Sequence, residues 1–191
     1  APRDAVAELV VLLSSEDPGV RKRAARWLRG AGYLLLPWES ILRFALDDPE
    51  ACVRVEAARV LLERAAPREL LESAAVEGIA HDECAYDAGI LLLEVSPVSA
   101  RAISAMAAAA ARARSQGQVE FLWEGNLAAC GAVAVQALKP FLLHSNMHVR
   151  EGAVETLGRI GAEAVGAAED LARMLSDPSE EVRLAAIGAL G

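Results

Sequence analysis

The histidines are the first side chains to test for chemistry. His144 and His148 are four residues apart, a spacing that can bring two imidazoles to one metal ion on a helix. Ser145 and Asn146 lie between them and indicate a turn, and no thiol or acidic ligand is adjacent. We therefore expect two solvated turn histidines and no metal site.

The run His81-Asp82-Glu83-Cys84 contains three types of metal ligand, but the repeat described below places Cys84 at a buried position. The cysteines Cys52, Cys84 and Cys130 are odd in number and share no close spacing, which favours reduced core thiols and the cytoplasm. The sequence has no phosphate-binding loop, dinucleotide fingerprint or nucleophile elbow. We expect no catalytic residue and no cofactor.

Five basic residues gather in the segment 20–29, namely Arg21, Lys22, Arg23, Arg26 and Arg29. Such a cluster can bind phosphate, but the whole chain carries a net charge of −8 from 19 basic and 27 acidic side chains. Because phosphate contacts supply much of the affinity for nucleic acid, this balance argues against a nucleic-acid ligand. A solvated terminal helix is the simpler interpretation.

These residues are positioned by an internal repeat. Asp-Pro occurs at 17–18, 48–49 and 177–178, and each copy is followed by Val-Arg and an alanine-rich amphipathic stretch. A fourth Val-Arg stands at 149–150, and Cys84 and Val119 fill the gaps as degenerate copies. The anchor positions 20, 53, 84, 119, 149 and 182 are therefore 30 to 35 residues apart, which is the period of a helical solenoid.

The residue types explain each unit. Aspartate caps free N–H groups at a helix start, and proline is tolerated in the first turn. The chain is 54% hydrophobic but only 4% aromatic, and its alanines allow close helix packing. We predict six helix pairs in one domain, with approximate boundaries at 1–32, 33–65, 66–96, 97–131, 132–161 and 162–191. The end in mid-pattern, and the start without methionine, favour a piece of a longer array.

The pattern Asp-Pro-x-x-x-Val-Arg-x-x-Ala-Ala-x-x-Leu, followed by Ile-Gly-Ala-x-Ala-Val, resembles the HEAT repeat, especially its short variety in phycobilisome lyases. The resemblance implies an all-α, right-handed solenoid. It also implies an Asp–Arg ladder between adjacent repeats, formed here by Asp17, Arg21, Asp48, Arg54, Arg150, Asp177 and Arg183. Ala85 and Glu120 replace the arginine in repeats three and four, so we expect the ladder to lapse there.

The helical period divides each second helix into two faces. Offsets 0, 4, 7, 8 and 11 from the anchor form the expected core, which includes Trp27 and Trp123. Offsets 2, 6 and 9 form an opposite stripe on the concave side, which we predict to bind a partner. Its candidate residues are Lys22, Arg26, Arg29, Val55, Arg59, Leu62, Tyr86, Ile90, Leu93, Phe121, Glu151 and Glu155.

This stripe runs from basic through apolar and aromatic to acidic, and clustered exposed apolar groups mark interaction sites. An alternative is that repeats three and four are out of register and bury these residues.

No apolar run approaches the 18–20 or so residues that a membrane span needs. We expect a cytoplasmic, non-enzymatic scaffold for a protein or peptide. A phycobilin lyase-type or chaperone-like role is the alternative, and a nucleic-acid-binding role is a more distant one.

Overall fold

The computed structural model describes residues 2–30, 45–62, 67–95, 98–117 and 122–191. Every regular element within these ranges is an α-helix or a 3₁₀ helix, which confirms the predicted all-α fold. The chain divides into two compact units, residues 1–96 and 97–191, and the division falls between the third and fourth predicted repeats. Within the described ranges, no helix combines the length and apolar character that a membrane crossing requires.

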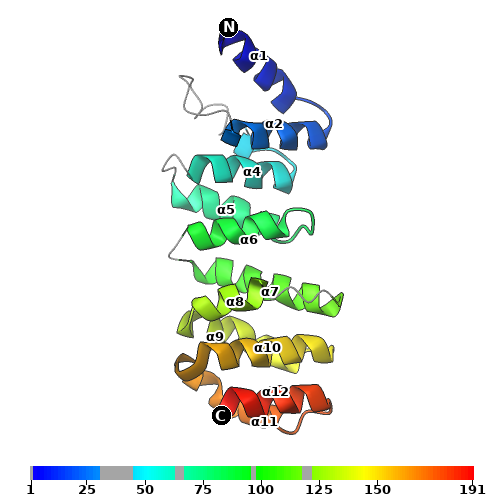
Figure 1. Ribbon diagram of the computed structural model, residues 1–191, viewed down its shortest axis with the longest axis vertical. Coiled ribbons are helices and arrows are strands. Elements are labelled where there is room, and N and C mark those ends of the chain that lie inside the picture. The colour runs from blue at the N-terminus through cyan, green and yellow to red at the C-terminus, as the bar shows by residue number, and fades with distance from the viewer. Residues whose placement is uncertain (1, 31–44, 63–66, 96–97, 118–121) are drawn as a thin grey trace. The chain divides into compact units, whose positions relative to one another are not determined.

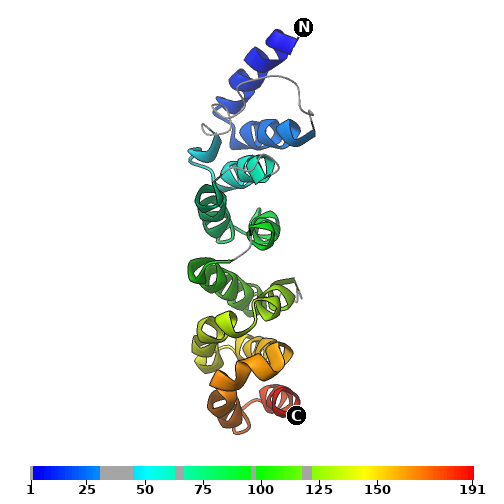
Figure 2. The same ribbon diagram turned by 90° about the vertical axis from the view of Figure 1, so that its left-hand side faces the viewer.

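Unit 1 contains α1 (Pro2–Leu13), α2 (Pro18–Gly30), α4 (Ala51–Leu62), α5 (Arg68–Gly78) and α6 (Ala85–Glu94). Helix α1 packs on α2, α2 on α4, and α5 on both α4 and α6. In Figure 2, α4 and α6 lie in one layer and α5 in the other, as expected for stacked helix pairs.

Unit 2 contains α7 (Ala100–Ser115), α8 (Leu122–Ala129), α9 (Ala132–Leu138), η1 (Lys139–Leu143), α10 (Met147–Ile160), η2 (Gly161–Ala167), α11 (Ala168–Met174) and α12 (Glu180–Leu190). The second helices α10 and α12 pack side by side, as Figure 1 shows, and α10 also packs against α7 and α8. The helix pairs that the structure describes are thus stacked within each unit.

The burial of α6 agrees with the predicted core face of the third, degenerate repeat. All five predicted core residues of this repeat are buried: Cys84, Ala88, Leu91, Leu92 and Val95. Tyr86, on the opposite side, is 55% exposed. In repeat three, the buried and exposed faces therefore agree with the register derived from the anchor positions.

Trp27 departs from the predicted core, because 56% of its surface is exposed. It is at offset 7 of the first repeat, and the same offset in repeat five is Thr156, which is buried against α7. In the described part of unit 1, Trp27 instead lines an opening between α1 and α2. The side chain of Trp123 lies outside the described residues.

Each aspartate of the repeat fixes the turn before a second helix. One carboxylate oxygen of Asp48 accepts the Glu50 N–H at 2.8 Å, and Asp177 accepts the Ser179 N–H at 2.9 Å. In repeat five Asn146 performs this role, with its oxygen 2.9 Å from the His148 nitrogen. An amide can therefore replace the carboxylate where only the helix start must be capped.

The arginine that follows the anchor joins neighbouring repeats. Arg21 donates from Nε and Nη2 to the two oxygens of Asp48, at 2.7 and 3.0 Å, and from Nη1 to the carbonyls of Ser15 and Glu16. Arg150 binds Asp177 in the same way, at 2.7 and 2.8 Å. Each arginine thus connects the turn of its own repeat to the aspartate of the next.

The ladder changes where the sequence pattern changes. Arg54 donates to the carbonyls of Asp48 and Pro49, as the other ladder arginines do with their own turns, but its Nη2 binds Glu77 at 2.9 Å. Helix α6 begins at Ala85, so it has no arginine at the ladder position, and Glu120 lies outside the described residues.

Close helix packing requires glycine at Gly158. A Cβ atom there would lie 2.9 Å from the Ala189 Cβ and 3.0 Å from its Cα. The Ala189 backbone would have to shift to make room for it. A Cβ atom at Gly188, also in a helix, would meet nothing within 4 Å. The glycine at 158 therefore sets the distance between α10 and α12.

We predict that Gly158→Ala lowers the free energy of unfolding by about 1–3 kcal/mol, because the added methyl overpacks the α10–α12 contact. The control Gly188→Ala should be neutral or stabilising by up to about 1 kcal/mol, since alanine has the better helix propensity. Urea unfolding followed by circular dichroism measures both. Equal effects of the two substitutions would contradict the assigned packing.

A second prediction concerns acid stability. The Arg150 hydrogen bond lowers the pKa of Asp177, so the stability that this carboxylate contributes is present above its usual pKa. That contribution is lost as the pH falls through the lowered value. Asp177→Asn keeps the cap but removes the charge, so it should cost about 1.5–3 kcal/mol at neutral pH and less as the pH falls. Glu169→Gln, at a fully exposed site, is the control, and unfolding at several pH values gives the comparison.

Candidate partner-binding surface

The predicted stripe of unit 1 is most accessible on α6. Tyr86 is exposed, and Ile90 and Leu93 on the same helical face are half-buried. The spacing of four and then three residues places these side chains on one side of the helix. The alternative register, in which this face is buried, is inconsistent with the exposure of Tyr86.

The arginines of the stripe are held by carboxylates of the next repeat. Arg26 donates to Glu56, a side chain of which only 2% is exposed, and Arg59 donates to Asp87. Nη2 of Arg26 is also 3.8 Å from an Asp87 oxygen. The basic end of the predicted stripe is therefore largely neutralised within unit 1, while Lys22 remains half-buried beside it.

Val55 does not belong to the exposed stripe, and its prediction as a binding residue is wrong. It is fully buried because α5 approaches α4 closely at this point. A Cβ atom added to Gly78 of α5 would lie only 2.2 Å from the Val55 Cγ2. Leu62 is half-buried, and both Phe121 and the side chain of Arg29 lie outside the described residues.

The acidic part of the stripe in unit 2 surrounds Arg114. Its guanidinium donates to Glu124 at 2.7 Å and to Glu155 at 2.7 Å, and it lies 3.8 Å from Glu151. Burial opposes the charge of Arg114, but the hydrogen bonds and charges of Glu124 and Glu155 outweigh it and raise its pKa. The acidic residues of the stripe thus serve to hold a buried arginine.

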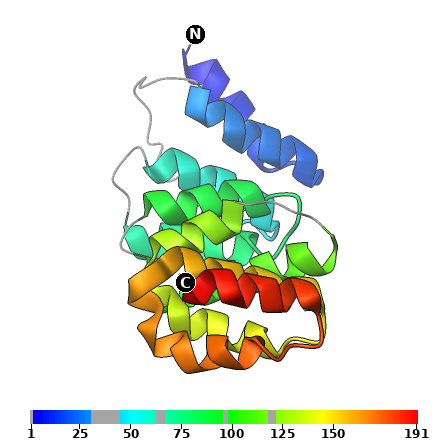
Figure 3. The same cartoon turned by 60° about the horizontal axis from the view of Figure 1, so that its bottom comes forward.

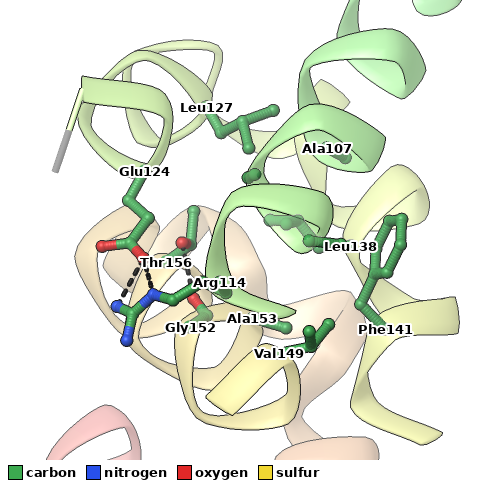
Figure 4. Close-up of a pocket in the computed structure, with 12 residues that line it drawn as sticks. Ala107, Arg114, Glu124, Leu127, Leu138, Phe141, Val149, Gly152, Ala153 and Thr156 are labelled. Atoms are coloured by element: carbon green, nitrogen blue, oxygen red, sulfur yellow. Dashed lines mark hydrogen bonds and ion pairs between the residues drawn. The ribbon is translucent and has the colours of Figure 1, made fainter. Parts of the chain in front are cut away.

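Figure 4 shows Arg114 and Glu124 at the edge of a small pocket between α7, α8 and α10. The rest of the lining is mainly small and apolar, with Ala107 from α7 and Ala153 and Gly152 from α10. The volume is about 20 Å³. A single water needs roughly 10–15 Å³, and ligand pockets usually measure about 300–1,000 Å³. This pocket is a packing gap between repeats.

A larger opening lies between α1 and α2, with a volume of about 510 Å³. Its lining is mostly apolar and includes Leu9, Leu12 and Trp27, with Glu8 and Arg23 at exposed positions. This groove was not predicted, because Trp27 was assigned to the core. It offers apolar surface to another molecule.

The remaining candidate groups are a buried thiol and two histidines near one turn. Burial is the main cause that raises the pKa of the Cys84 thiol, so it stays protonated and weakly nucleophilic. His144 accepts the Asn146 N–H at 3.1 Å, and His148 is exposed beside Glu151. Among the described residues, no group of three histidine, cysteine or acidic side chains could hold a metal ion.

Sequence reasoning missed the acidic partners of the stripe, although unit 1 contained a signal for them. Arg26 and Arg59 are both six residues past their anchors, and Glu56 and Asp87 are both three residues past the next anchors. A comparison of charges one repeat apart would have paired them. Glu124 has no such signal, because it and Arg114 are in different helices of one degenerate repeat.

We predict that Arg114→Met destabilises the protein by about 3–5 kcal/mol, because it removes the main partner of the buried Glu124 carboxylate. Arg114→Met combined with Glu124→Gln should recover most of this loss, since the most deeply buried carboxylate is then removed and Glu151 and Glu155 are more exposed. Chemical denaturation of the two variants tests the coupling. A single variant as stable as the parent would show that Glu124 does not depend on Arg114.

The described surfaces can be set beside known proteins. Two crystal structures of engineered proteins from the Northeast Structural Genomics Consortium are similar to this chain. The first is 23% identical, with a TM-score of 0.44, and the match covers 97% of this chain and 95% of the engineered chain. The second is 22% identical, with a TM-score of 0.41, and covers 96% of this chain and 56% of its own. No curated protein is significantly similar in sequence.

A family model of HEAT repeats matches residues 98–191, which is nearly all of unit 2. The ladder contact of that unit, Arg150 with Asp177, has the same geometry as Arg21 with Asp48 in unit 1. The helix pairs and the ladder contact of unit 2 agree with this match, and residues 98–191 belong to the HEAT-repeat family.

Proposed function

We propose that the protein is a non-enzymatic scaffold that binds another protein or a peptide on the exposed face of α6 in unit 1. The observation that carries this proposal is Tyr86, which is 55% exposed next to the half-buried Ile90 and Leu93. A tyrosine with an apolar ring and a polar hydroxyl is a frequent anchor in protein interfaces.

The neighbouring charges favour an apolar segment of polypeptide as the ligand. Arg59 already binds Asp87, the residue after Tyr86, so its guanidinium is not available to a phosphate without breaking an ion pair. Arg26 is engaged with Glu56 in the same way. Asp87, the chain neighbour of Tyr86, belongs to these pairs, and an apolar centre with a polar rim is the arrangement found in protein interfaces.

The junction pocket beside Arg114 is not suited to catalysis. Its volume of about 20 Å³ leaves no room for an organic substrate, and its two charged groups, Arg114 and Glu124, are bound to each other. Catalysis would require groups free to act on a substrate within reach. A scaffold requires only the exposed face of a rigid helix.

The test is a selection of peptides from a random library on the whole chain, followed by affinity measurements. We expect Tyr86→Ala to weaken a selected peptide by roughly 30-fold, the loss that corresponds to about 2 kcal/mol at an interface anchor. Tyr86→Phe separates the ring from the hydroxyl. Leu143→Ala, at a residue that is 83% exposed in unit 2, is the control and should leave affinity unchanged.

Thermal unfolding of the same variants must accompany the affinities, because Tyr86 is exposed and its loss should cost little stability. Selected peptides that bind Tyr86→Ala as tightly as the parent would contradict the proposed surface. A selection that yields no peptide above background would contradict the proposed role.

A further inference from the structure

Helix α6 has charged residues at both ends of the apolar face on which the proposed function rests. This face runs from Tyr86 through Ile90 to Leu93. An exposed carboxylate stands at each end of it: Glu83 lies in the turn before the helix, and Glu94 is the last residue of the helix. Among the described residues, neither carboxylate has an ion-pair partner. The face therefore has an apolar centre and two acidic ends.

The basic residues of the stripe in unit 1 do not neutralise these acidic ends. Helix α6 packs against α4 (Figure 3, with α6 in green and α4 in cyan), and Arg59 of α4 binds Asp87. Arg26 of α2 binds Glu56 in the same way. Lys22, also on α2, is half-buried. The exposed charges on α6 itself are thus negative.

The charge of unit 1 as a whole has the same sign. Residues 1–96 carry 17 acidic and 11 basic side chains. An excess of one sign attracts partners of the opposite sign and speeds their association. Both the acidic ends of α6 and the charge of unit 1 therefore favour a ligand with positive charge on either side of an apolar centre.

The backbone of the ligand must also have its hydrogen bonds satisfied. An extended peptide leaves N–H and C=O groups that need partners. Helix α6 cannot supply them, because its backbone bonds within the helix, as in the 2.9 Å bond from the Ala88 N–H to the Cys84 carbonyl. The regular elements of the described ranges include no strand edge, and Asp87 and Arg59 bind each other. A helical ligand satisfies its own backbone and needs only side-chain contacts.

The spacing on α6 defines the spacing on such a helix. Tyr86 and Leu93 are seven positions apart, which is roughly 10 Å along a helix, and Glu83 and Glu94 are eleven positions apart, roughly 16 Å. Apolar residues at i, i+4 and i+7 form one face of a partner helix and match the apolar centre. A lysine or arginine one turn beyond each end of that face lies opposite a carboxylate.

We infer that the ligand of this face is a basic amphipathic helix. It has an apolar stripe about two turns long and a lysine or arginine beyond each end of the stripe. This inference rests on the proposed peptide-binding role and names the class of peptide that binds. The acidic ends determine the charge of the ligand, and the lack of backbone partners determines its conformation.

The probes are four synthetic peptides of equal length, with both termini blocked and with leucine at i, i+4 and i+7. In three of them the residues one turn beyond the leucines are lysine, glutamine or glutamate. The fourth is the lysine peptide with a proline between the leucines. Titration calorimetry measures their affinity for the whole chain, and circular dichroism measures how much helix the peptide gains on binding.

We expect the lysine peptide to bind about tenfold more tightly than the glutamine peptide, since it gains two exposed ion pairs. The glutamate peptide should bind more weakly than both. This preference should shrink in 1 M salt, where the screening length is only about 3 Å. The proline peptide should not bind, because proline disrupts the helix.

Two matched variants test the place of the charge. Glu94→Lys reverses one acidic end and should weaken the lysine peptide about tenfold, with little effect on the glutamine peptide. Glu69→Lys is the control, because it makes the same change in net charge at an exposed position of α5. Helix α5 lies in the other layer of unit 1 in Figure 2. The control should leave both affinities unchanged.

The inference would be overturned if none of the four peptides bound, or if the lysine and glutamate peptides bound equally well. It would also be overturned by equal effects of Glu94→Lys and Glu69→Lys, or by binding without a gain of helix. The proposed function survives these results if peptides selected from the random library still depend on Tyr86. Loss of that dependence contradicts the proposed function itself, so the two failures are distinguishable.

Discussion

The contact on which the fold depends is the fork of an arginine on the aspartate of the next repeat. Arg150 binds both oxygens of Asp177, and its remaining nitrogen holds two carbonyls of its own turn. One oxygen of Asp177 also caps the start of α12. A single carboxylate thus fixes the helix start and the stacking distance together. Lysine could not replace the arginine, because a point charge lacks the planar fork that makes both bonds.

A second set of ion pairs determines which parts of the surface remain open to a partner. Arg26 pairs with Glu56, and Arg114 with Glu124, and each pair neutralises a buried carboxylate. Their burial is tolerated because each is paired with a guanidinium. What is left exposed on α6 is the ring of Tyr86. The charged part of the stripe is therefore held by ion pairs, and Tyr86 is the exposed aromatic side chain on which the proposed binding role rests.

The sequence predicted the helix pairs and the ladder because both depend on contacts that recur at a fixed spacing. It placed Cys84 in the core and Tyr86 outside it for the same reason. It could not predict the burial of Val55, which depends on how closely Gly78 of α5 approaches. It also misplaced Trp27, because a periodic rule does not show whether another helix covers a given face. Individual helix crossings are tertiary, and local periodicity does not contain them.

The ladder has a consequence for how such a chain can change in evolution. A repeat with the full pattern carries one aspartate facing back and one arginine facing forward, so a duplicated segment that contains both brings both halves of its own ladder contacts. The interval between Val149 and Val182 is 33 residues, and inserting one such segment preserves the existing ladder contacts. Duplication or deletion of whole repeats can therefore lengthen or shorten the array without requiring a new interface to be selected. Insertions of other lengths within a helix pair would separate the arginine and the aspartate of a ladder contact.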